Sequence, residues 1–215
     1  MASVRVILVD DHAVVREGYR RLLERTRDIE VLAEAASGEE AYRLFCEMSP
    51  DVVVLDINLP GMSGIEATRR ILAREPDARV LVFSMHEDAL FGSRALQAGA
   101  RGYVTKASAP EVLVEAVRTV AQGRVFISHD MAQPLALQSV PGQELPLDAL
   151  SPREFEVFRL LAEGKPVSEI ARILSLSQKT IANYQSAIRQ KLEADTSAQM
   201  VWIALKRGVV GDKAK

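Results

Sequence analysis

The sequence has one cysteine, no long apolar run and no excess of proline or glycine. The single cysteine, Cys46, excludes an internal disulfide, and no cysteine or histidine accompanies it at metal-ligand spacing, so structural zinc is excluded as well. We expect Cys46 to be a packing residue of a helix. With 9 prolines and 12 glycines, usage is close to average, which excludes a collagen-like or broadly disordered chain. The longest apolar runs, such as Val80 to Phe83, are far shorter than the ~20 residues that cross a bilayer, and the first ten residues lack a signal-peptide pattern, so we expect a cytoplasmic protein with no membrane partner.

What is present is typical of a globular chain, with 48% hydrophobic and 26% charged residues. The charge is unevenly distributed along the 215 residues. Residues 1–122 hold 15 basic and 19 acidic side chains, residues 123–149 hold 1 and 3, and residues 150–215 hold 11 and 7. An acidic first part and a basic second part indicate two domains with different partners, of which the second is a candidate for binding a polyanion.

Short β-branched runs alternate with stretches of helical periodicity over residues 1–122. The strand at Val52 to Leu55 is apolar at every position, as a parallel sheet buried on both faces requires. The pattern predicts an α/β fold, a doubly wound parallel (βα)5 sheet, in which chemistry gathers where the strands end. The expected strands lie at 4–9, 29–35, 52–55, 79–83 and 102–104, and the helices that follow them at 13–26, 38–48, 64–74, 88–98 and 109–122.

The pattern breaks after residue 122. Pro134, Pro141 and Pro146 interrupt residues 123–149, which we predict to be a linker with one helical turn near 131–137. No strand signal returns in residues 150–215, which predict a small all-α domain of the size that carries helix-turn-helix units. Its helices are expected at 151–163, 167–174, 178–192 and 196–207.

Polar side chains follow the predicted strands of the first domain. Asp10 and Asp11 follow the first strand, Asp56 follows the third, Ser84 follows the fourth, and Lys106 lies just beyond the fifth. Because the ends of parallel strands meet at one edge, we expect these side chains to converge. Three carboxylates in a partly desolvated pocket must protonate or take up a cation, and an all-oxygen ligand set favours Mg²⁺. One carboxylate beside Mg²⁺ and an ammonium can act as a nucleophile toward a phosphoryl group.

Each of these residues also has a simpler interpretation. Asp10 or Asp11 can cap the following helix, and Asp56 can be a turn residue. Ser84 and Lys106 can be an ordinary strand-end hydroxyl and a solvated loop lysine. The convergence of all five on one edge favours a functional site.

Four segments of residues 1–122 resemble the receiver domain of two-component response regulators: Val9 to His12, Leu55 to Gly64, Phe83 and Ser84, and Gly102 to Lys106. The resemblance implies that Asp56 accepts a phosphoryl group from a sensor histidine kinase. It further implies that Mg²⁺ is held by Asp10, Asp11, Asp56 and the backbone carbonyl of Asn58, and that Lys106 binds the phosphoryl group. Ser84 and Tyr103 match the switch hydroxyl and the switch aromatic of the family. Asn58 and His86 stand at positions where the family tunes the lifetime of the phosphoryl group.

Residues 166–192 have helix-turn-helix spacing, with a short amphipathic helix, a turn at 175–177 and a longer helix from Gln178 to Lys191. The exposed side of the longer helix could enter a major groove, where cations contact phosphates and an amide such as that of Asn183 can pair with adenine. The same pattern also fits a three-helix bundle with a solvated face.

Residues 150–209 resemble the LuxR-type helix-turn-helix through the segments 150–157, 160–164, 169–174 and 176–185. With the receiver resemblance, the whole chain is similar to response regulators of the NarL/FixJ group, and residues 126–139 resemble the GacA/UvrY branch of it. The resemblance implies base-facing positions at Ala182, Asn183 and Ser186, and backbone-contacting or supporting positions at Lys179, Thr180, Tyr184 and Lys191.

The last predicted helix is more apolar than a lone terminal helix needs, with Met200, Trp202 and Ile203. As in the family, it could form a two-fold contact in a homodimer that assembles on phosphorylation and pairs two recognition helices on an inverted repeat of double-stranded DNA. Trp202 fits the core of its own domain equally well.

We therefore expect a DNA-binding response regulator, not an enzyme, in which phosphorylation of Asp56 shifts domain arrangement and dimerisation and so controls transcription. A Mg²⁺-dependent aspartyl phosphatase is an alternative, disfavoured because Asn58 stands where a second aspartate would act as general acid. A regulator that binds DNA independently of phosphorylation is another.

Overall fold

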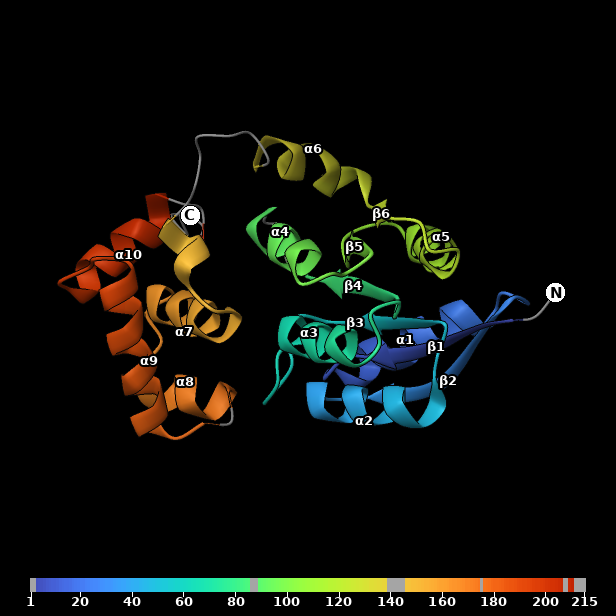
Figure 1. Cartoon of the computed structure of the whole chain (residues 1–215), viewed down its shortest axis with the longest axis horizontal. Coiled ribbons are helices and arrows are strands. Elements are labelled where there is room, and N and C mark those ends of the chain that lie inside the picture. Colours follow the sequence, from blue (N-terminus) through green and yellow to red (C-terminus); the bar gives the residue numbers. More distant parts are fainter. Residues whose placement is uncertain (1–2, 86–88, 139–145, 175, 207–208, 211–215) are drawn as a thin grey trace. The chain divides into compact units, whose positions relative to one another are not determined.

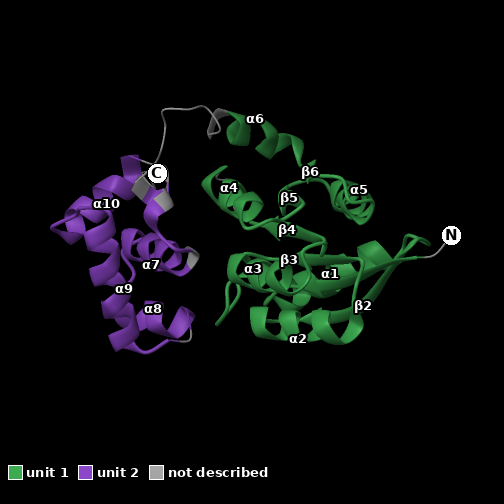
Figure 2. Ribbon diagram, in the orientation of Figure 1, with its two compact units in different colours: residues 1–139 green, residues 140–215 purple. Residues whose placement is uncertain are grey.

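The structure is a computed structural model that describes residues 3–85, 89–138, 146–174, 176–206 and 209–210. The chain divides into two compact units, residues 1–139 and residues 140–215 (Figure 2). The first unit is a parallel α/β sandwich and the second is helical, so the predicted fold class is confirmed. Within the described ranges, every helix is too short or too polar to cross a membrane.

The first unit is a six-stranded sheet with helices on both faces. The strands are β1 Val4–Val9, β2 Ile29–Ala35, β3 Val52–Leu55, β4 Val80–Ser84, β5 Gly102–Thr105 and β6 Phe126–Ile127. The helices are α1 Ala13–Glu24, α2 Gly38–Met48, α3 Gly64–Arg74, α4 Ala89–Gln97, α5 Pro110–Ala121 and α6 His129–Gln138. The strands lie in the order β2-β1-β3-β4-β5-β6, and each neighbouring pair is parallel (Figure 1). Leu23 of α1 and the apolar side of α5 pack on one face of this sheet, and α2 and α3 cover the other.

The start of the predicted linker is part of the first unit. Strand β6 pairs with β5, and α6 packs on α4 (Figure 1). Helix α6 packs on the first unit because it has an apolar side: Met131 and Leu135 lie four residues apart on one side of the helix, and both are buried. They approach α4 at Gly92, where an added Cβ would lie 3.0 Å from each side chain. Pro134 is tolerated inside this helix.

The second unit contains a short 3-10 helix over Pro146–Ala149 and four α-helices, which agree with the expected ranges to within two residues. Ser151 and Glu154 form a reciprocal capping box at the start of the first of them. Phe155, Phe158 and Ile181 are fully buried in the core of this unit. The helices are α7 Pro152–Ala162, α8 Val167–Ile173, α9 Gln178–Lys191 and α10 Ser197–Lys206. Ser175, in the predicted turn between α8 and α9, lies outside the described residues.

The expectation for Cys46 is wrong in one respect. It lies on α2 as expected, but its side chain is exposed rather than packed. Its neighbours Leu44 and Phe45 occupy the buried side of that helix.

Candidate functional site

Three backbone hydrogen bonds place the central side chains at the carboxyl edge of the sheet. The Asp10 amide donates to the carbonyl of Ala35 (3.1 Å), and the Asp56 amide donates to the carbonyl of Val9 (3.0 Å). The Lys106 amide donates to the carbonyl of Ser84 (2.8 Å). Residues that follow different strands are thereby held side by side, as the sequence predicts for a parallel sheet.

Lys106 joins two buried carboxylates. Its Nζ donates to Asp10 Oδ2 and to Asp56 Oδ2, each at 2.5 Å. The side chains of Lys106, Asp10 and Asp56 are 5%, 3% and 5% exposed, so their charges interact in a poorly solvated pocket. The structure thus brings together Asp10, Asp56 and Lys106, which lie far apart in the sequence.

Burial and charge act in opposite directions on these groups. Burial raises the pKa of the Asp56 carboxyl, and although Lys106 lowers it, the net pKa lies above the ordinary value. Burial lowers the pKa of the Lys106 ammonium, but the charges of Asp56 and Asp10 outweigh it, and the net pKa is raised. Lys106 is therefore held in its charged form.

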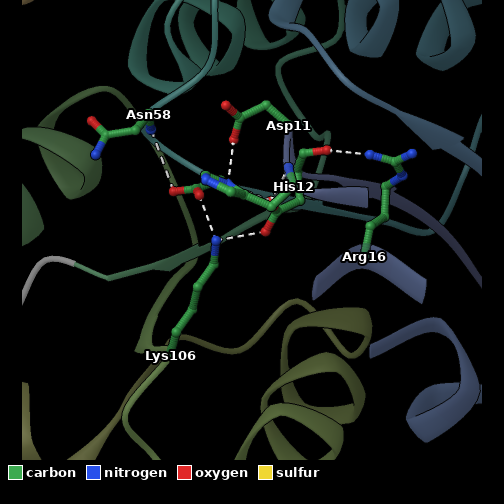
Figure 3. A network of polar contacts seen from close by, with 7 residues as sticks. Asp11, His12, Arg16, Asn58 and Lys106 are labelled. Atoms are coloured by element: carbon green, nitrogen blue, oxygen red, sulfur yellow. Dashed lines mark hydrogen bonds and ion pairs between the residues drawn. The ribbon is translucent and has the colours of Figure 1, made fainter. Parts of the chain in front are cut away.

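Asp11 and His12 form the outer part of the pocket. His12 Nδ1 lies 2.8 Å from Asp11 Oδ1 and 3.4 Å from Asp10 Oδ1 (Figure 3). Ligand atoms of Asp10, Asp11 and His12 all lie within 4.8 Å of one another. Sequence reasoning did not assign His12 to the site, although its position directly after the two aspartates was the available signal.

The pocket fits a divalent cation. Asp10, Asp11 and Asp56 supply three carboxylates against the single ammonium of Lys106, and the donors are almost all oxygen, the set that Mg²⁺ prefers. The simpler interpretation, in which Asp10 or Asp11 caps α1, is not met, because the N-cap residue of α1 is His12 and no side-chain cap hydrogen bond forms there. Asp10 Oδ1 instead accepts from the His12 amide at 2.8 Å, just before the helix begins.

The loop after Asp56 is held closely against its surroundings. The Asn58 amide lies 3.3 Å from Asp56 Oδ1, and the Met62 amide donates to Glu39 Oε1 at 2.9 Å. Gly64 begins α3 so close to β3 that an added Cβ would lie 2.0 Å from the Asp56 carbonyl oxygen. Only glycine fits there, and the loop that carries Asn58 is correspondingly restrained.

The two predicted switch residues are in the sheet core. Ser84 at the end of β4 pairs in register with Thr105, and Tyr103 pairs with Val82. Both Ser84 and Tyr103 are fully buried. His86 lies outside the described residues.

Sequence reasoning missed a second set of polar residues next to Lys106. Thr105 Oγ1 donates to Asp130 Oδ2 at 2.6 Å, and Ser108 Oγ lies 3.3 Å from Asp130 Oδ1. Because Asp130 is 25 residues from Thr105 and belongs to a helix that was not expected as a whole, no local pattern could have indicated this contact.

In the second unit, α9 presents an exposed face that carries Lys179, Ala182, Asn183 and Ser186. Thr180 and Tyr184 are half-buried, in keeping with supporting positions. Lys191 is engaged within its own unit, since its Nζ donates to Glu154 Oε2 at 2.7 Å and so joins α9 to the start of α7.

The three residues expected at a dimer contact differ in exposure. Met200 is 2% exposed and packs inside the second unit. Trp202 is 60% exposed and Ile203 is half-buried. The surface of α10 therefore offers Trp202, with Lys206 Nζ 4.7 Å from the centre of its ring.

Comparison with known proteins agrees with this architecture. Residues 6–118 match the family described as response regulator receiver domain, and residues 148–204 match bacterial regulatory proteins of the luxR family. The chain is 41% identical to transcriptional activator protein ExaE of Pseudomonas putida over 95% of its length and 97% of that protein. It is 38% identical to response regulator GacA of Pseudomonas aeruginosa over 96% of its length and 98% of that protein.

The chain is also similar to a solved structure of the Salmonella typhimurium response regulator RcsB, whose description concerns conformational dynamism for DNA interaction. The two sequences are 28% identical, the TM-score is 0.68, and the match covers 94% of this chain and 96% of the RcsB chain. The predicted family and function are confirmed at this level. The α/β unit with its buried aspartate pair and lysine, and the helical unit with its exposed α9, occur together in one chain. The protein belongs to the LuxR family of DNA-binding two-component response regulators.

Proposed function

We propose that phosphorylation of Asp56 by a sensor histidine kinase switches this protein between two states that differ in DNA binding. The observation that carries the proposal is the arrangement of Lys106 Nζ at 2.5 Å from both Asp10 and Asp56. An ammonium held at this point is positioned to stabilise the negative charge of a phosphoryl group that transfers to Asp56.

The chemistry is a displacement at phosphorus. A carboxylate oxygen of Asp56 forms a bond to the phosphorus atom while the bond from phosphorus to the kinase imidazole nitrogen breaks, and that nitrogen keeps the electron pair and takes a proton. Asp10, Asp11, Asp56 and the Asn58 carbonyl would hold Mg²⁺, which when bound supplies positive charge to the phosphoryl oxygens. The buried position of Asp56 limits access of water to the acyl phosphate.

The phosphoryl group changes the charge at the sheet edge, since it adds up to about two negative charges and three acceptor oxygens. Ser84 at the end of β4 and Lys106 after β5 are the groups that would meet these oxygens. Tyr103 is buried on β5, three residues before Lys106 and in register with Val82. Their rearrangement would bias an equilibrium between an inactive and an active state that already exists.

In the active state, α9 would lie in the major groove of double-stranded DNA. Ala182, Asn183 and Ser186 would face bases, and Lys179 would contact the backbone with support from Thr180 and Tyr184. In a homodimer formed through the exposed part of α10, at Trp202 and Ile203, two such helices would match an inverted repeat. The contact of Lys191 with Glu154 would hold α9 against the start of α7 in this arrangement.

The test uses DNA selected from a random pool with the protein treated with a small acyl phosphate and Mg²⁺. We expect the treated wild type to bind this DNA more tightly than the untreated protein, and Asp56→Ala to lose the difference. Asp77→Ala, which changes an exposed aspartate in the α3–β4 loop near the amino edge of the sheet, is the matched control and should behave like wild type. If Asp56→Ala binds this DNA as tightly as the treated wild type, the result favours a phosphorylation-independent regulator. Steady turnover of small phosphate esters by the wild type would favour an aspartyl phosphatase.

A further inference from the structure

Asp130, in the first turn of α6, is bonded to the segment that carries Lys106. Its Oδ2 accepts from Thr105 Oγ1 at 2.6 Å, and its Oδ1 lies 3.3 Å from Ser108 Oγ. The two hydroxyls are themselves 3.0 Å apart. Thr105 directly precedes Lys106 and Ser108 follows it by two residues, so one carboxylate holds the chain on both sides of the lysine.

The Asp130 carboxylate is suited to this contact. Partial burial raises its pKa, but hydrogen bonds from Thr105 and neighbouring hydroxyls lower it more, and the net pKa lies below the ordinary value. The group is therefore an ionised acceptor at neutral pH. A hydrogen bond to a charged acceptor is stronger than one between neutral groups, and at 2.6 Å the Thr105 contact is of the strong kind.

The helix that carries Asp130 is itself held against the first unit. The Ser128 amide donates to the carbonyl of Tyr103 at 3.0 Å, which joins the chain just before α6 to β5. Met131 and Leu135 bury the apolar side of α6 against α4 at Gly92. A carboxylate on an element held by both strand pairing and packing can restrain a neighbouring loop, whereas one on a free tail could not.

We propose that Asp130 is a positioning residue for phosphoryl transfer to Asp56: through Thr105 and Ser108 it fixes residues 105–108 and so places the Lys106 ammonium beside the acceptor carboxylate. The inference rests on the proposed role of Asp56. It also links the site to α6, the last helix before the second unit begins at residue 140. By thermodynamic reciprocity, docking of α6 and occupation of the site by a phosphoryl group affect each other.

A purely structural role would give a different pattern of results. Asp130 lies at the amino end of α6, where a negative charge stabilises the helix whether or not it contacts Thr105. Thr105→Val removes the donor and leaves Asp130 and its charge in place, while Thr105→Ser keeps the donor. Only the positioning role predicts that serine restores the reaction and valine does not.

The experiment measures the initial rate at which the full-length protein is labelled by a small acyl phosphate in the presence of Mg²⁺. We expect Thr105→Val and Asp130→Ala each to be labelled about tenfold more slowly, the ratio that corresponds to one hydrogen bond to a charged group. The variant that combines Thr105→Val with Asp130→Ala should be labelled no more slowly than the slower of the two single variants, because both changes remove the contact between Thr105 and Asp130. Thr105→Ser should be labelled at nearly the wild-type rate.

Thr26→Val is the matched control. Its hydroxyl donates to the Leu23 carbonyl at 2.6 Å just beyond the carboxyl end of α1, before β2, and its loss should leave the labelling rate unchanged. Ser108→Ala changes a half-buried residue outside the fully buried core and keeps the test valid if Thr105→Val does not fold. We expect it to slow labelling about twofold because the 3.3 Å contact of Ser108 with Asp130 is weaker than that of Thr105.

Two results separate failure of this inference from failure of the proposed function. Wild-type labelling at Asp56 with unchanged rates in Thr105→Val and Ser108→Ala would overturn the role of Asp130 and leave the proposed function intact. Additive slowing in the double variant would also overturn it. Absence of label at Asp56 in the wild type would overturn both.

Discussion

Replacement of Lys106 by methionine tests the electrostatics of the site. The substitution keeps an apolar stem of similar length and removes the charge that joins Asp10 and Asp56. Removal of one partner from a buried ion pair costs about 3–5 kcal/mol, because the remaining charge is left without compensation. Since Lys106 contacts two carboxylates that are 3% and 5% exposed, we expect the free energy of unfolding of the first unit to fall by about 4 kcal/mol at pH 7.

The loss should depend on pH in a definite direction. Burial raises the pKa of Asp56 even with Lys106 present, and without the ammonium that lowers it, its pKa rises further. A carboxyl whose pKa is higher in the folded than in the unfolded state destabilises the fold at neutral pH, and this penalty disappears as pH falls through the folded pKa toward the unfolded one. The difference between wild type and Lys106→Met is therefore largest near pH 7 and shrinks on acidification.

The assay is urea unfolding followed by far-ultraviolet circular dichroism at pH 7 and about pH 5. The single tryptophan, Trp202, lies in the second unit, so its fluorescence follows that unit separately and should show little change. Lys165→Met is the matched control, since its ion pair with Glu169 is partly exposed and worth less than about 1 kcal/mol. Equal stability of Lys106→Met and wild type at pH 7, or a difference that grows on acidification, would show that Lys106 does not compensate the two buried carboxylates.

Three further predictions concern other parts of the molecule. Gly64→Ala forces a Cβ to within 2.0 Å of the Asp56 carbonyl oxygen, so it should destabilise the first unit by about 1–3 kcal/mol and slow phosphoryl uptake at Asp56, as measured by urea unfolding and acyl-phosphate labelling. Burial raises the pKa of the Glu154 carboxyl, but hydrogen bonds from Lys191 and Ser151 lower it more, so the net pKa lies below the ordinary value. The ionised carboxylate therefore stabilises the second unit above the unfolded-state pKa, and this stabilisation is lost as pH falls through the folded-state pKa. Tryptophan fluorescence should therefore show that Lys191→Met costs about 1 kcal/mol near pH 7 and less near pH 4, and an equal cost at both would contradict this. Lys179→Ala should weaken DNA binding on all sequences alike and reduce the slope of binding against log salt by about 1, whereas a change confined to one sequence would argue against a backbone contact.

The α/β part of the fold was predictable because its signals are local. Val52 to Leu55 is apolar at each position and is followed by Asp56, so both the strand and its end are visible in the sequence. The convergence of Asp10, Asp56 and Lys106 then follows from the parallel topology alone. The sequence could not give their pairing through a single Nζ, which depends on how the Lys106 side chain packs.

The features that escaped prediction depend on tertiary contacts. A two-residue strand such as Phe126–Ile127 is too short to show an alternating pattern, and Pro134 reads as a helix breaker although α6 continues past it. The apolar content of α10 predicted burial, but only the packed structure separates Met200, which is buried, from Trp202, which is exposed.

The proposed switch depends on acceptance of the phosphoryl group by Asp56. The most direct test treats the full-length protein with a small acyl phosphate and Mg²⁺, reduces the acyl phosphate with borohydride to a stable alcohol, and locates the altered residue by peptide mass spectrometry. We expect a single altered position, Asp56, and much less modification in Lys106→Met. Modification of another aspartate in preference to Asp56, or an unmodified Asp56 under these conditions, would contradict it.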